Sequence, residues 1–413
     1  MLSRLFDKYW GLFLLAWGGT VVYNVPFLRY LMYDPIKDAL QFSHTQMGNM
    51  MGVYGLTALV SYWPGGWMAD RISPRYLLSI SYLASGLVGI WFAAFPSYAA
   101  CLFIHAVWGV ATSLTFWPAL LKATNDLAPR EELGRFYGLL ESGRGILTIL
   151  TVNFCVWIFA FYTDEVRGMS VVINILNGFC LAAVPMTWFW FKDPAELKPN
   201  PSLTKDIVTV IKSPWIWCVS LIVLSTYSSL VLGTYFTPYM TEILGISTVT
   251  IGVLSTIWIY GSQFLAAPLG GVVSDKLGAR PAVMMVLFGI FMIISLVAVL
   301  APAKASMFVL MVILAAGLYC AIYAIRGIYF AVLEDLQVPP AIIGSALGFA
   351  SLIGFAPDAF LYPAAGMILD AYPGVTGYKI LFGLAGAAGT LGLAMSLAIM
   401  MKVKSLKKAG GGV

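Results

Sequence analysis

Five charged side chains lie inside long apolar stretches, and their types could bind ions or pass protons: Arg29, Glu141, Arg144, Arg326 and Asp358. A charge at the centre of a membrane helix costs about 2.5–3.5 kcal/mol on insertion scales, so such groups usually face a partner or a water-filled cavity. The sequence has no nucleotide-binding loop of the Gly-x-x-x-x-Gly-Lys-(Ser/Thr) type, no metal-ligand spacing and no nucleophile–base set. We therefore expect solute binding without catalysis, cofactor or metal.

Glu141 and Arg144 are three residues apart and would share one face of a helix, with Tyr137 one turn earlier. Counting from Gly134, the pair lies near mid-depth, where carriers built from two halves bind their solutes. One interpretation is that Arg144 binds an anionic group while Glu141 tunes the arginine or carries a proton. The other is an internal ion pair that only stabilises the bundle.

Arg326 has Tyr319 and Tyr323 on its own helical face. A guanidinium binds carboxylate, sulfonate or phosphate oxygens, and aromatic rings can stack on the organic body that carries them. Contact with a solute is therefore one interpretation of this group. The alternative is that Arg326 pairs with a carboxylate such as Asp358 or Glu334.

Asp358 stands in the stretch Gly354-x-x-Pro357-Asp358. A glycine and a proline this close predict a locally broken membrane helix, whose freed carbonyl groups need partners. Asp358 could be a proton site, the counter-ion of Arg326, or a group that packs helices together.

Arg29 lies in the outer third of the first apolar stretch, after Pro26. Its long side chain could reach the outer surface, or its charge could help an outward-facing cavity to capture anions. Asn24, one turn further in, is a candidate neutral contact. Three intramembrane arginines against two carboxylates favour an anionic or polar organic solute over a cation.

The elements that must position these residues are membrane helices. Hydrophobic residues make up 60% of the chain and charged residues 10%, against about 45–50% and 25% in soluble proteins. Lipid leaves no partner for unpaired backbone groups, so the spans must be helical and the fold all-α. We predict twelve transmembrane helices, over residues 9–33, 45–70, 75–95, 98–122, 134–161, 168–191, 214–241, 248–275, 280–301, 305–333, 341–370 and 376–402.

The distribution of lysine and arginine predicts the orientation of these spans. With the N-terminus in the cytoplasm, 17 basic residues fall in inner segments and 4 in outer segments, as the positive-inside rule requires. Both termini would be cytoplasmic, and we expect a monomer in a bacterial inner membrane. The net charge of +5 is dispersed over many loops, which does not indicate nucleic-acid binding.

The longest polar stretch divides the chain into two halves. We predict an N-terminal six-helix bundle over 1–191, a cytoplasmic linker over 192–213 that includes a short surface helix, a C-terminal bundle over 214–402 and a tail over 403–413. Two copies of Gly-x-x-x-Asp-(Arg/Lys)-x-x-x-Arg support the duplication. The first runs from Gly66 through Asp70 and Arg71 to Arg75, and the second from Gly271 through Asp275 and Lys276 to Arg280.

This repeated turn resembles the signature of the major facilitator superfamily, Gly-x-x-x-Asp-(Arg/Lys)-x-Gly-x-(Arg/Lys). The second copy matches it fully through Gly278, and the first departs from it only at Ser73. The resemblance implies two pseudo-symmetric six-helix bundles around a central cavity that opens alternately to each side. In that family the signature is thought to latch the outward-open state, which implies conformational gating by six residues here: Asp70, Arg71, Arg75, Asp275, Lys276 and Arg280.

A weaker likeness points to the organophosphate:phosphate antiporter branch of the family. It rests on Tyr23-Asn24, on the stretch 70–77 and on the stretch 237–242. That branch has an arginine where this chain has Val22 and a second one near Leu230. Those two arginines bind the phosphate there, so their absence here argues against phosphate-ester exchange.

The expected function is secondary active transport of a small organic anion, such as a carboxylate or an acidic sugar derivative. Coupling to protons would use Glu141 or Asp358 as the carrier. One alternative is an exchanger or exporter of neutral or amphipathic compounds, in which the charges are purely structural. Another is a membrane receptor that keeps the fold but does not cycle.

Overall fold

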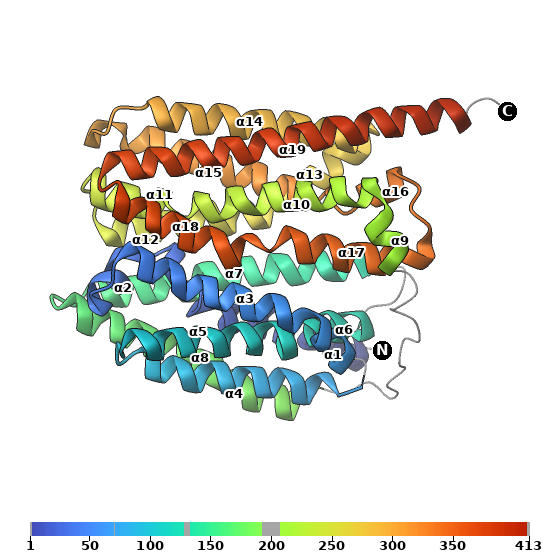
Figure 1. The fold of residues 1–413 in the computed structure, drawn as a ribbon. Coiled ribbons are helices and arrows are strands. Elements are labelled where there is room, and N and C mark those ends of the chain that lie inside the picture. Colours follow the sequence, from blue (N-terminus) through green and yellow to red (C-terminus); the bar gives the residue numbers. More distant parts are fainter. Residues whose placement is uncertain (1, 70, 128–132, 192–206, 411–413) are drawn as a thin grey trace.

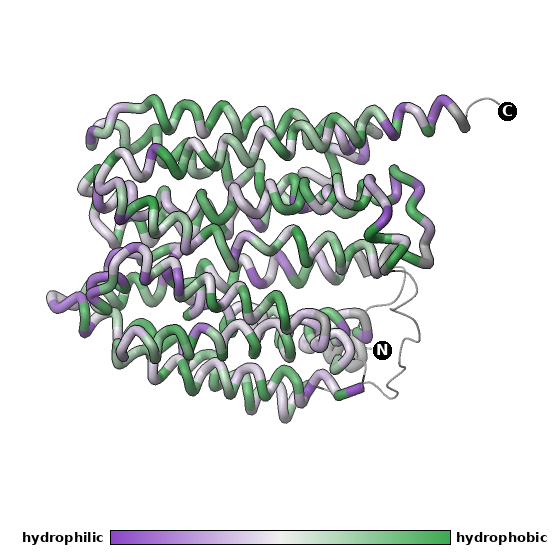
Figure 2. Tube along the Cα trace, viewed as in Figure 1, coloured by the Kyte–Doolittle hydropathy of each residue, from purple (hydrophilic) through white to green (hydrophobic). Residues whose placement is uncertain are grey.

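The computed structural model describes residues 2–69, 71–127, 133–191 and 207–410. This part of the chain is helical and contains no strand. The long helices run side by side in one bundle, and both termini lie at the same end of it (Figure 1). We call that end the terminal face and the opposite end the sealed face. Apolar residues cover the helix sides, and hydrophilic residues gather near the two ends (Figure 2).

Six long helical segments form the N-terminal half. They are α1 (Leu2–Asn24), α3 (His44–Ala69), α4 (Pro74–Phe92), the continuous run of α5 (Tyr98–Val110), the π-helical η2 (Ala111–Phe116) and α6 (Trp117–Leu127), then α7 (Leu133–Phe159) and α8 (Glu165–Trp190). A short 3-10 turn, η1 (Leu28–Tyr30), and α2 (Tyr33–Leu40) follow α1 at the sealed face.

Six more segments form the C-terminal half. They are α10 (Pro214–Gly233) with α11 (Phe236–Pro238) and the π-helical η4 (Tyr239–Ile243), α12 (Thr248–Thr256) with the π-helical η5 (Ile257–Gly261) and α13 (Ser262–Leu277), α14 (Arg280–Leu300), η6 (Ala305–Met307) with α15 (Phe308–Arg326), α17 (Pro340–Gly354) with α18 (Pro357–Ala371), and α19 (Val375–Gly410). The short α16 (Val332–Asp335) lies between α15 and α17.

Ten of these described segments are long and apolar enough to cross a bilayer. The other two predicted spans are α1 and α3, which are 23 and 26 residues long. Charged or polar residues near the start of each helix lower its hydropathy: Arg4, Asp7 and Lys8 in α1, and His44, Gln46 and Asn49 in α3. Both pack inside the bundle, α1 against α7 and α3 against α5 and α18, so the twelve-segment arrangement is complete in the described residues.

Two predicted spans end earlier than expected, for local steric reasons. The first ends at Asn24 and not at residue 33, because Pro26 lacks the N–H that would continue the helix. The tenth ends at Arg326 and not at residue 333. There Gly327 passes so close to α13 that an added Cβ would lie 2.3 Å from the Ala267 carbonyl oxygen. The chain turns at this contact before α16.

The predicted break in the eleventh span is confirmed. Helix α17 ends at Gly354 and α18 begins at Pro357. The predicted last span continues past residue 402, because α19 runs without interruption to Gly410. Most of the predicted linker, 192–206, lies outside the described residues. The rest of it contains α9 (Ile207–Lys212), a single short helix.

The two halves meet closely at the sealed face. Helix α3 packs along α18, where glycines remove the side chains that would separate the backbones. A Cβ on Gly48 would lie 2.3 Å from the Tyr362 carbonyl oxygen, and one on Gly366 would lie 2.3 Å from the His44 carbonyl oxygen. Small residues at helix interfaces permit this approach in membrane proteins. The sealed face is therefore closed by direct backbone packing.

Candidate substrate site between the two halves

Arg144 and Glu141 form an ion pair in the middle of α7. The Arg144 Nη1 atom donates to Glu141 Oε1 at 2.6 Å, and its Nε donates to the Gly19 carbonyl oxygen of α1 at 3.0 Å. The guanidinium lies 5.6 Å from the Tyr23 ring centroid and 5.5 Å from that of Trp117. Arg144 is thus held in place by α1, α6 and its own helix.

The second oxygen of Glu141 reaches the other half of the protein. Glu141 Oε2 accepts a hydrogen bond from Gln263 Nε2 of α13 at 2.7 Å. The Glu141 side chain nevertheless keeps 40% of its surface exposed, whereas that of Arg144 keeps 15%. Solvent therefore reaches this carboxylate at mid-helix between the two bundles, and we call the accessible space beside it the hollow. The ion pair anticipated as one alternative is therefore present, and it lines this hollow.

Arg326 lies at the end of α15, yet deep in the bundle. Its neighbour Gly327 contacts α13 at Ala267, ten residues before α13 ends at Leu277. At 1.5 Å per residue this is about 15 Å from the helix end. Ala267 also lies one helical turn from Gln263, the residue of α13 that binds the ion pair of α7. Arg326 therefore lies near that ion pair.

No hydrogen bond or ion pair joins the Arg326 side chain to another residue in the described part of the chain. Its guanidinium carbon lies 5.3 Å from the Tyr323 ring centroid. The two counter-ions considered from the sequence are used elsewhere. Asp358 accepts from the Tyr227 hydroxyl at 2.9 Å, and Glu334 pairs with Arg280 at 3.1 Å. The pairing alternative for Arg326 is therefore wrong in this conformation.

Two tyrosines continue the wall next to Arg326. Tyr319 and Tyr323 are 1% and 7% exposed, and their rings stack with centroids 6.5 Å apart. The Tyr319 hydroxyl has no hydrogen-bond partner among the described residues. The sequence placed both rings on the face of Arg326, and the structure brings Tyr323 against it.

Asp358 is buried at the start of α18, with 7% of its surface exposed. Its Oδ2 atom accepts the bond from Tyr227, and its buried Oδ1 has no partner among the described residues. A buried carboxylate with one neutral donor and no cation is poorly solvated. A proton on Oδ1 would remove that charge, so the geometry favours the neutral acid in this conformation.

Tyr137 and Asn24 bind neighbours within the N-terminal half. The Tyr137 hydroxyl donates to the Leu121 carbonyl oxygen of α6 at 3.2 Å. The Asn24 Nδ2 atom donates to Thr151 Oγ1 of α7 at 3.1 Å. These bonds join α7 to α6 and α1 to α7, next to the hollow.

Arg29 does not reach the outer surface, so the expectation that it snorkels is wrong. It is 4% exposed and donates to the Met47 carbonyl oxygen at 3.0 Å and to the Tyr235 hydroxyl at 3.4 Å. Its guanidinium also lies over the rings of Tyr33 and Tyr362, at 5.1 and 4.8 Å. The two halves close around Arg29 and separate it from the hollow.

The second signature loop forms a charged network at the terminal face. Arg280 contacts Asp275 at 3.0 Å, Glu334 at 3.1 Å and Asp335 at 3.2 Å, and it donates to the Ala331 carbonyl oxygen at 3.1 Å. The last three partners belong to α16 and the turn before it, and of these only Ala331 lies within the predicted tenth span. Lys276 is exposed beside this network.

The first signature loop is described only in part, because Asp70 lies outside the described residues. Arg71 donates to the Trp67 carbonyl oxygen at 3.1 Å and lies 4.4 Å from the same tryptophan ring. Arg75 donates to the carbonyl oxygen of Phe191, at the end of α8, at 2.8 Å. This loop therefore joins α3 and α4 to the end of the N-terminal half.

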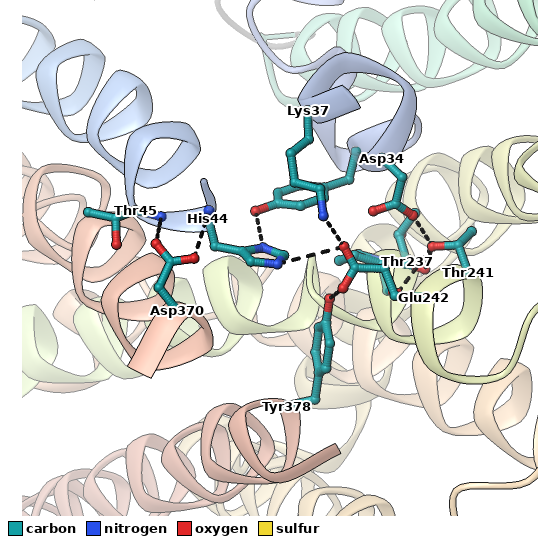
Figure 3. Close-up of polar contacts among 11 residues, drawn as sticks. Asp34, Lys37, His44, Thr45, Thr237, Thr241, Glu242, Asp370 and Tyr378 are labelled. Carbon is teal, nitrogen blue, oxygen red and sulfur yellow. Dashed lines mark hydrogen bonds and ion pairs between the residues drawn. The ribbon is translucent and has the colours of Figure 1, made fainter. Parts of the chain in front are cut away.

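A polar cluster at the sealed face was missed by the sequence analysis (Figure 3). It joins α2 and the start of α3 to α11, η4, α18 and the start of α19. The bonds that join the two halves in this cluster link residues more than 200 positions apart, so no local spacing reveals them. The cluster consists of Asp34, Lys37, His44, Thr45, Thr237, Thr241, Glu242, Asp370 and Tyr378.

Comparison with curated proteins gives two relatives that align with nearly the whole chain and one that aligns with about two thirds of it. The chain is 27% identical to the inner membrane protein YihN of Escherichia coli K12, over 98% of both chains. It is 26% identical to the inner membrane protein YqcE of the same organism, over 96% of this chain and 95% of the relative. The membrane sensor protein UhpC of Escherichia coli K12 is 24% identical over 65% of this chain and 66% of its own length.

Solved structures share the fold at lower identity. A bacterial homologue of the lysosomal transporter Spinster, in an inward-facing and unoccupied conformation, has a TM-score of 0.71 at 15% identity, with 98% of both chains covered. The nucleoside transporter NupG has a TM-score of 0.74 at 16% identity, with 96% of this chain and 99% of that chain covered. The family model of the Major Facilitator Superfamily matches residues 10–360. The chain therefore belongs to the Major Facilitator Superfamily.

Proposed function

We propose that this transporter carries a small organic anion, such as a carboxylate or an acidic sugar derivative, and couples its movement to protons. Transport of a small molecule by alternating access follows from the family and the fold. The nature of the solute and of the coupling ion is our inference from the intramembrane charges.

The observation that carries the proposal is the unpaired guanidinium of Arg326. A partly buried cation that has no bonded counter-ion is unfavourable compared with one that is paired. An anionic group that enters the hollow would supply the missing partner, and Tyr323 offers a ring beside it. Arginine is suited to this role because its planar donors match carboxylate and phosphate oxygens.

Arg144 would be the second contact for the anion. In the empty protein it is paired with Glu141, whose other oxygen bonds Gln263 in the opposite half. An anion that binds Arg144 competes with Glu141, and the released carboxylate then becomes a proton acceptor. The ion pair would re-form when the solute leaves, which would allow the empty carrier to reset.

Asp358 is the second candidate for the proton. Its buried, singly bonded carboxyl group lies where α17 gives way to α18, and α18 packs on α3 of the other half. A change in that packing would expose the carboxyl group to water and favour loss of its proton.

The 17 to 4 distribution of basic residues supports the terminal face as cytoplasmic. Two relatives are named as inner membrane proteins, which agrees with placement in a bacterial inner membrane. In this orientation the structure is closed toward the outside.

Arg326→Ala tests the anion site. We expect it to weaken binding of an organic anion by about 10- to 100-fold, because hydrogen bonds to charged groups contribute about 1.5–3 kcal/mol. Thermal-shift titrations of the purified protein with a panel of carboxylates and acidic sugars identify a ligand, and the same titrations measure the loss.

Arg326→Lys keeps the positive charge but not the planar set of donors. Its affinity for the anion should therefore lie between that of Arg326→Ala and that of the wild-type protein. Arg167→Ala is the matched control, since Arg167 is an exposed arginine at the sealed face. Equal loss in Arg167→Ala and Arg326→Ala, or stabilisation by neutral compounds only, would contradict the anion site and favour a carrier of neutral solutes.

A second candidate function is a receptor that binds without cycling, because one relative is named a membrane sensor protein. Counterflow in proteoliposomes separates the two. A carrier exchanges labelled for unlabelled ligand across the bilayer, whereas a receptor binds the ligand and shows no exchange.

A further inference from the structure

Two carboxyl groups from opposite halves meet at the sealed face. Asp34 lies on α2 of the N-terminal half, and Glu242 lies on η4 of the C-terminal half. The Thr241 hydroxyl donates to Asp34 Oδ2. The other oxygen, Oδ1, is buried and has no partner among the described residues, and it is turned toward the Glu242 carboxylate (Figure 3).

Glu242 is already well supplied with donors. Lys37 Nζ lies 2.5 Å from Glu242 Oε1, the Tyr378 hydroxyl donates to Oε2 at 2.6 Å, and His44 Nε2 lies 3.7 Å from Oε1. Asp34 has only the Thr241 hydroxyl. One lysine therefore faces two carboxyl groups, and with a neutral His44 the group carries one uncompensated negative charge.

Other charges around the cluster do not compensate that negative charge. Asp370 accepts from the backbone N–H groups of His44 and Thr45, at 3.0 and 2.8 Å. Arg29 keeps its positive charge, because the Met47 carbonyl oxygen and the Tyr235 hydroxyl that it binds are neutral, but it is not among the main charges that act on Asp34. Asp38 is exposed to solvent. The titratable and charged groups that surround Asp34 are thus Lys37 and Asp38 on its own helix, Arg29 and Tyr33 before it, His44 on α3, Glu242 on η4, Asp370 on α18 and Tyr378 on α19.

Burial and then the charge of Glu242 raise the pKa of Asp34 to about 8, against the opposing effects of the Thr241 hydrogen bond and the Lys37 charge. Burial alone would lower the pKa of Lys37, but its hydrogen bond and ion pair with Glu242 raise it. Lys37 therefore stays charged, and the neutral member of the cluster is a carboxyl group.

We propose that Asp34 and Glu242 bind one proton between them while the sealed face is closed, and release it to the solution on that side when the halves part. Because α2 and η4 belong to different halves, opening separates the two carboxyl groups and brings water to Asp34. Asp34 then behaves as an ordinary aspartate with a pKa of about 3.9. The site is a proton-binding site separate from Glu141 and Asp358, and it does not depend on which solute is carried.

The ratio of closed to open protein depends on pH because closure is linked to proton binding. Between the two pKa values, about 3.9 when open and about 8 when closed, the closed form binds one more proton than the open form. The ratio of closed to open protein should therefore rise tenfold for each unit by which the pH falls in this window. Above it, the ratio becomes independent of pH.

Asp34→Asn tests the proposal through the distance between the halves. Spin labels at Glu165→Cys and Lys304→Cys, two exposed residues of opposite halves at the sealed face, would be introduced after replacing the five native cysteines. We expect the wild-type distance distribution to shift from short to long as the pH rises from 5 to 9. The Asp34→Asn variant keeps one side-chain oxygen but cannot ionise, so the distance between its spin labels should stay short over the whole pH range.

Asp38→Asn is the matched control, because it removes the same charge from the exposed side of the same helix. All measurements are repeated with His44→Gln, since histidine titrates in the same pH range. Should Asp34→Asn fail to fold, Glu242→Gln serves instead: it leaves Asp34 free to pair with Lys37 and should move the response to lower pH.

A pH response that persists unchanged in Asp34→Asn or in Glu242→Gln would overturn the proposal, and so would a wild-type protein whose distances do not change with pH. The experiment contains no solute. Its outcome is therefore separate from that of the Arg326 titrations, and either proposal can fail alone.

Discussion

Arg144 and Arg326 face the same hollow but differ in what holds them. Arg144 has a carboxylate at 2.6 Å, a carbonyl oxygen at 3.0 Å and two aromatic rings around it. Arg326 has a single ring at 5.3 Å. An added anion gains little by replacing a partner that is already present, but it gains the whole interaction at the unpaired group. Arg326 should therefore contribute more to affinity, and Arg144 more to the coupling between solute and Glu141.

Asp358→Asn separates the proton role of Asp358 from its role in packing. The amide keeps an oxygen that can accept from Tyr227, so we expect a melting temperature close to that of wild type. If Asp358 carries the proton, solute uptake into proteoliposomes should no longer respond to a pH gradient. Uptake that still follows the gradient would assign the proton to another group, and Glu141→Gln would then be measured in the same way.

Tyr227→Phe is the complementary change. It removes the one donor to Asp358 and leaves a buried oxygen unsatisfied, which costs about 1–3 kcal/mol. We expect a lower melting temperature for Tyr227→Phe than for Asp358→Asn. Equal melting temperatures would show that water replaces the tyrosine hydroxyl at this position.

Helices α3 and α18 close the sealed face through backbone contacts. An added Cβ on Gly55 would lie 2.4 Å from the backbone carbon of Asp358 and 2.6 Å from the Ala359 nitrogen. Neither atom belongs to a flexible side chain, so the helices themselves would have to move. Because α3 and α18 belong to different halves, we expect this contact to be lost when the halves part at this face.

Gly55→Ala should therefore shift the protein toward the state that is open at the sealed face. Overpacking typically costs 1–3 kcal/mol, which corresponds to a change of about 5- to 150-fold in the ratio of the two states. The spin-label pair at residues 165 and 304 measures it. Gly178→Ala on α8, where an added Cβ meets nothing within 4 Å, should leave the distances unchanged. A short distance retained in Gly55→Ala would mean that the closed packing tolerates the methyl group.

The sequence predicted the elements better than their contacts. Hydropathy located the spans, because each crosses lipid by itself, and Gly354 and Pro357 predicted the break in the eleventh span because helix breaking is local. The end of α15 at Arg326 depends on the approach of Gly327 to α13, which no local pattern shows. The burial of Arg29 likewise depends on how the two halves meet.

The candidate site was predictable to the extent that it lies on single helices. The spacing of Glu141 and Arg144 gave their ion pair, and that of Tyr323 and Arg326 gave their contact. Gln263 was missed because it reaches Glu141 from the other half. The cluster around Asp34 was missed for the same reason, and also because residues 34–44 fell between the first two predicted spans, where no helix was expected.

At the scale of the whole molecule, both termini lie at one face, as an even number of spans requires (Figure 1). We expect that face to be cytoplasmic. In intact cells a membrane-impermeant thiol reagent should label Glu165→Cys at the sealed face and leave Lys404→Cys at the terminal face unlabelled, in a background without native cysteines. If only Lys404→Cys were labelled in intact cells, the terminal face would lie outside the cell and the predicted orientation would be wrong. Both sites should react in broken cells, which controls for accessibility.

Asp370 of α18 binds the first backbone N–H groups of α3, so one half of the transporter caps a helix that belongs to the other. A helix start without such an acceptor leaves its N–H groups to water. When the halves part at this face, α3 loses these two acceptors but keeps the local bonds between Ser43 and Gln46, which cap it from within its own half. The Asp370 carboxylate is then left without the two N–H groups of α3, so the same bonds favour closure of the transporter at this face.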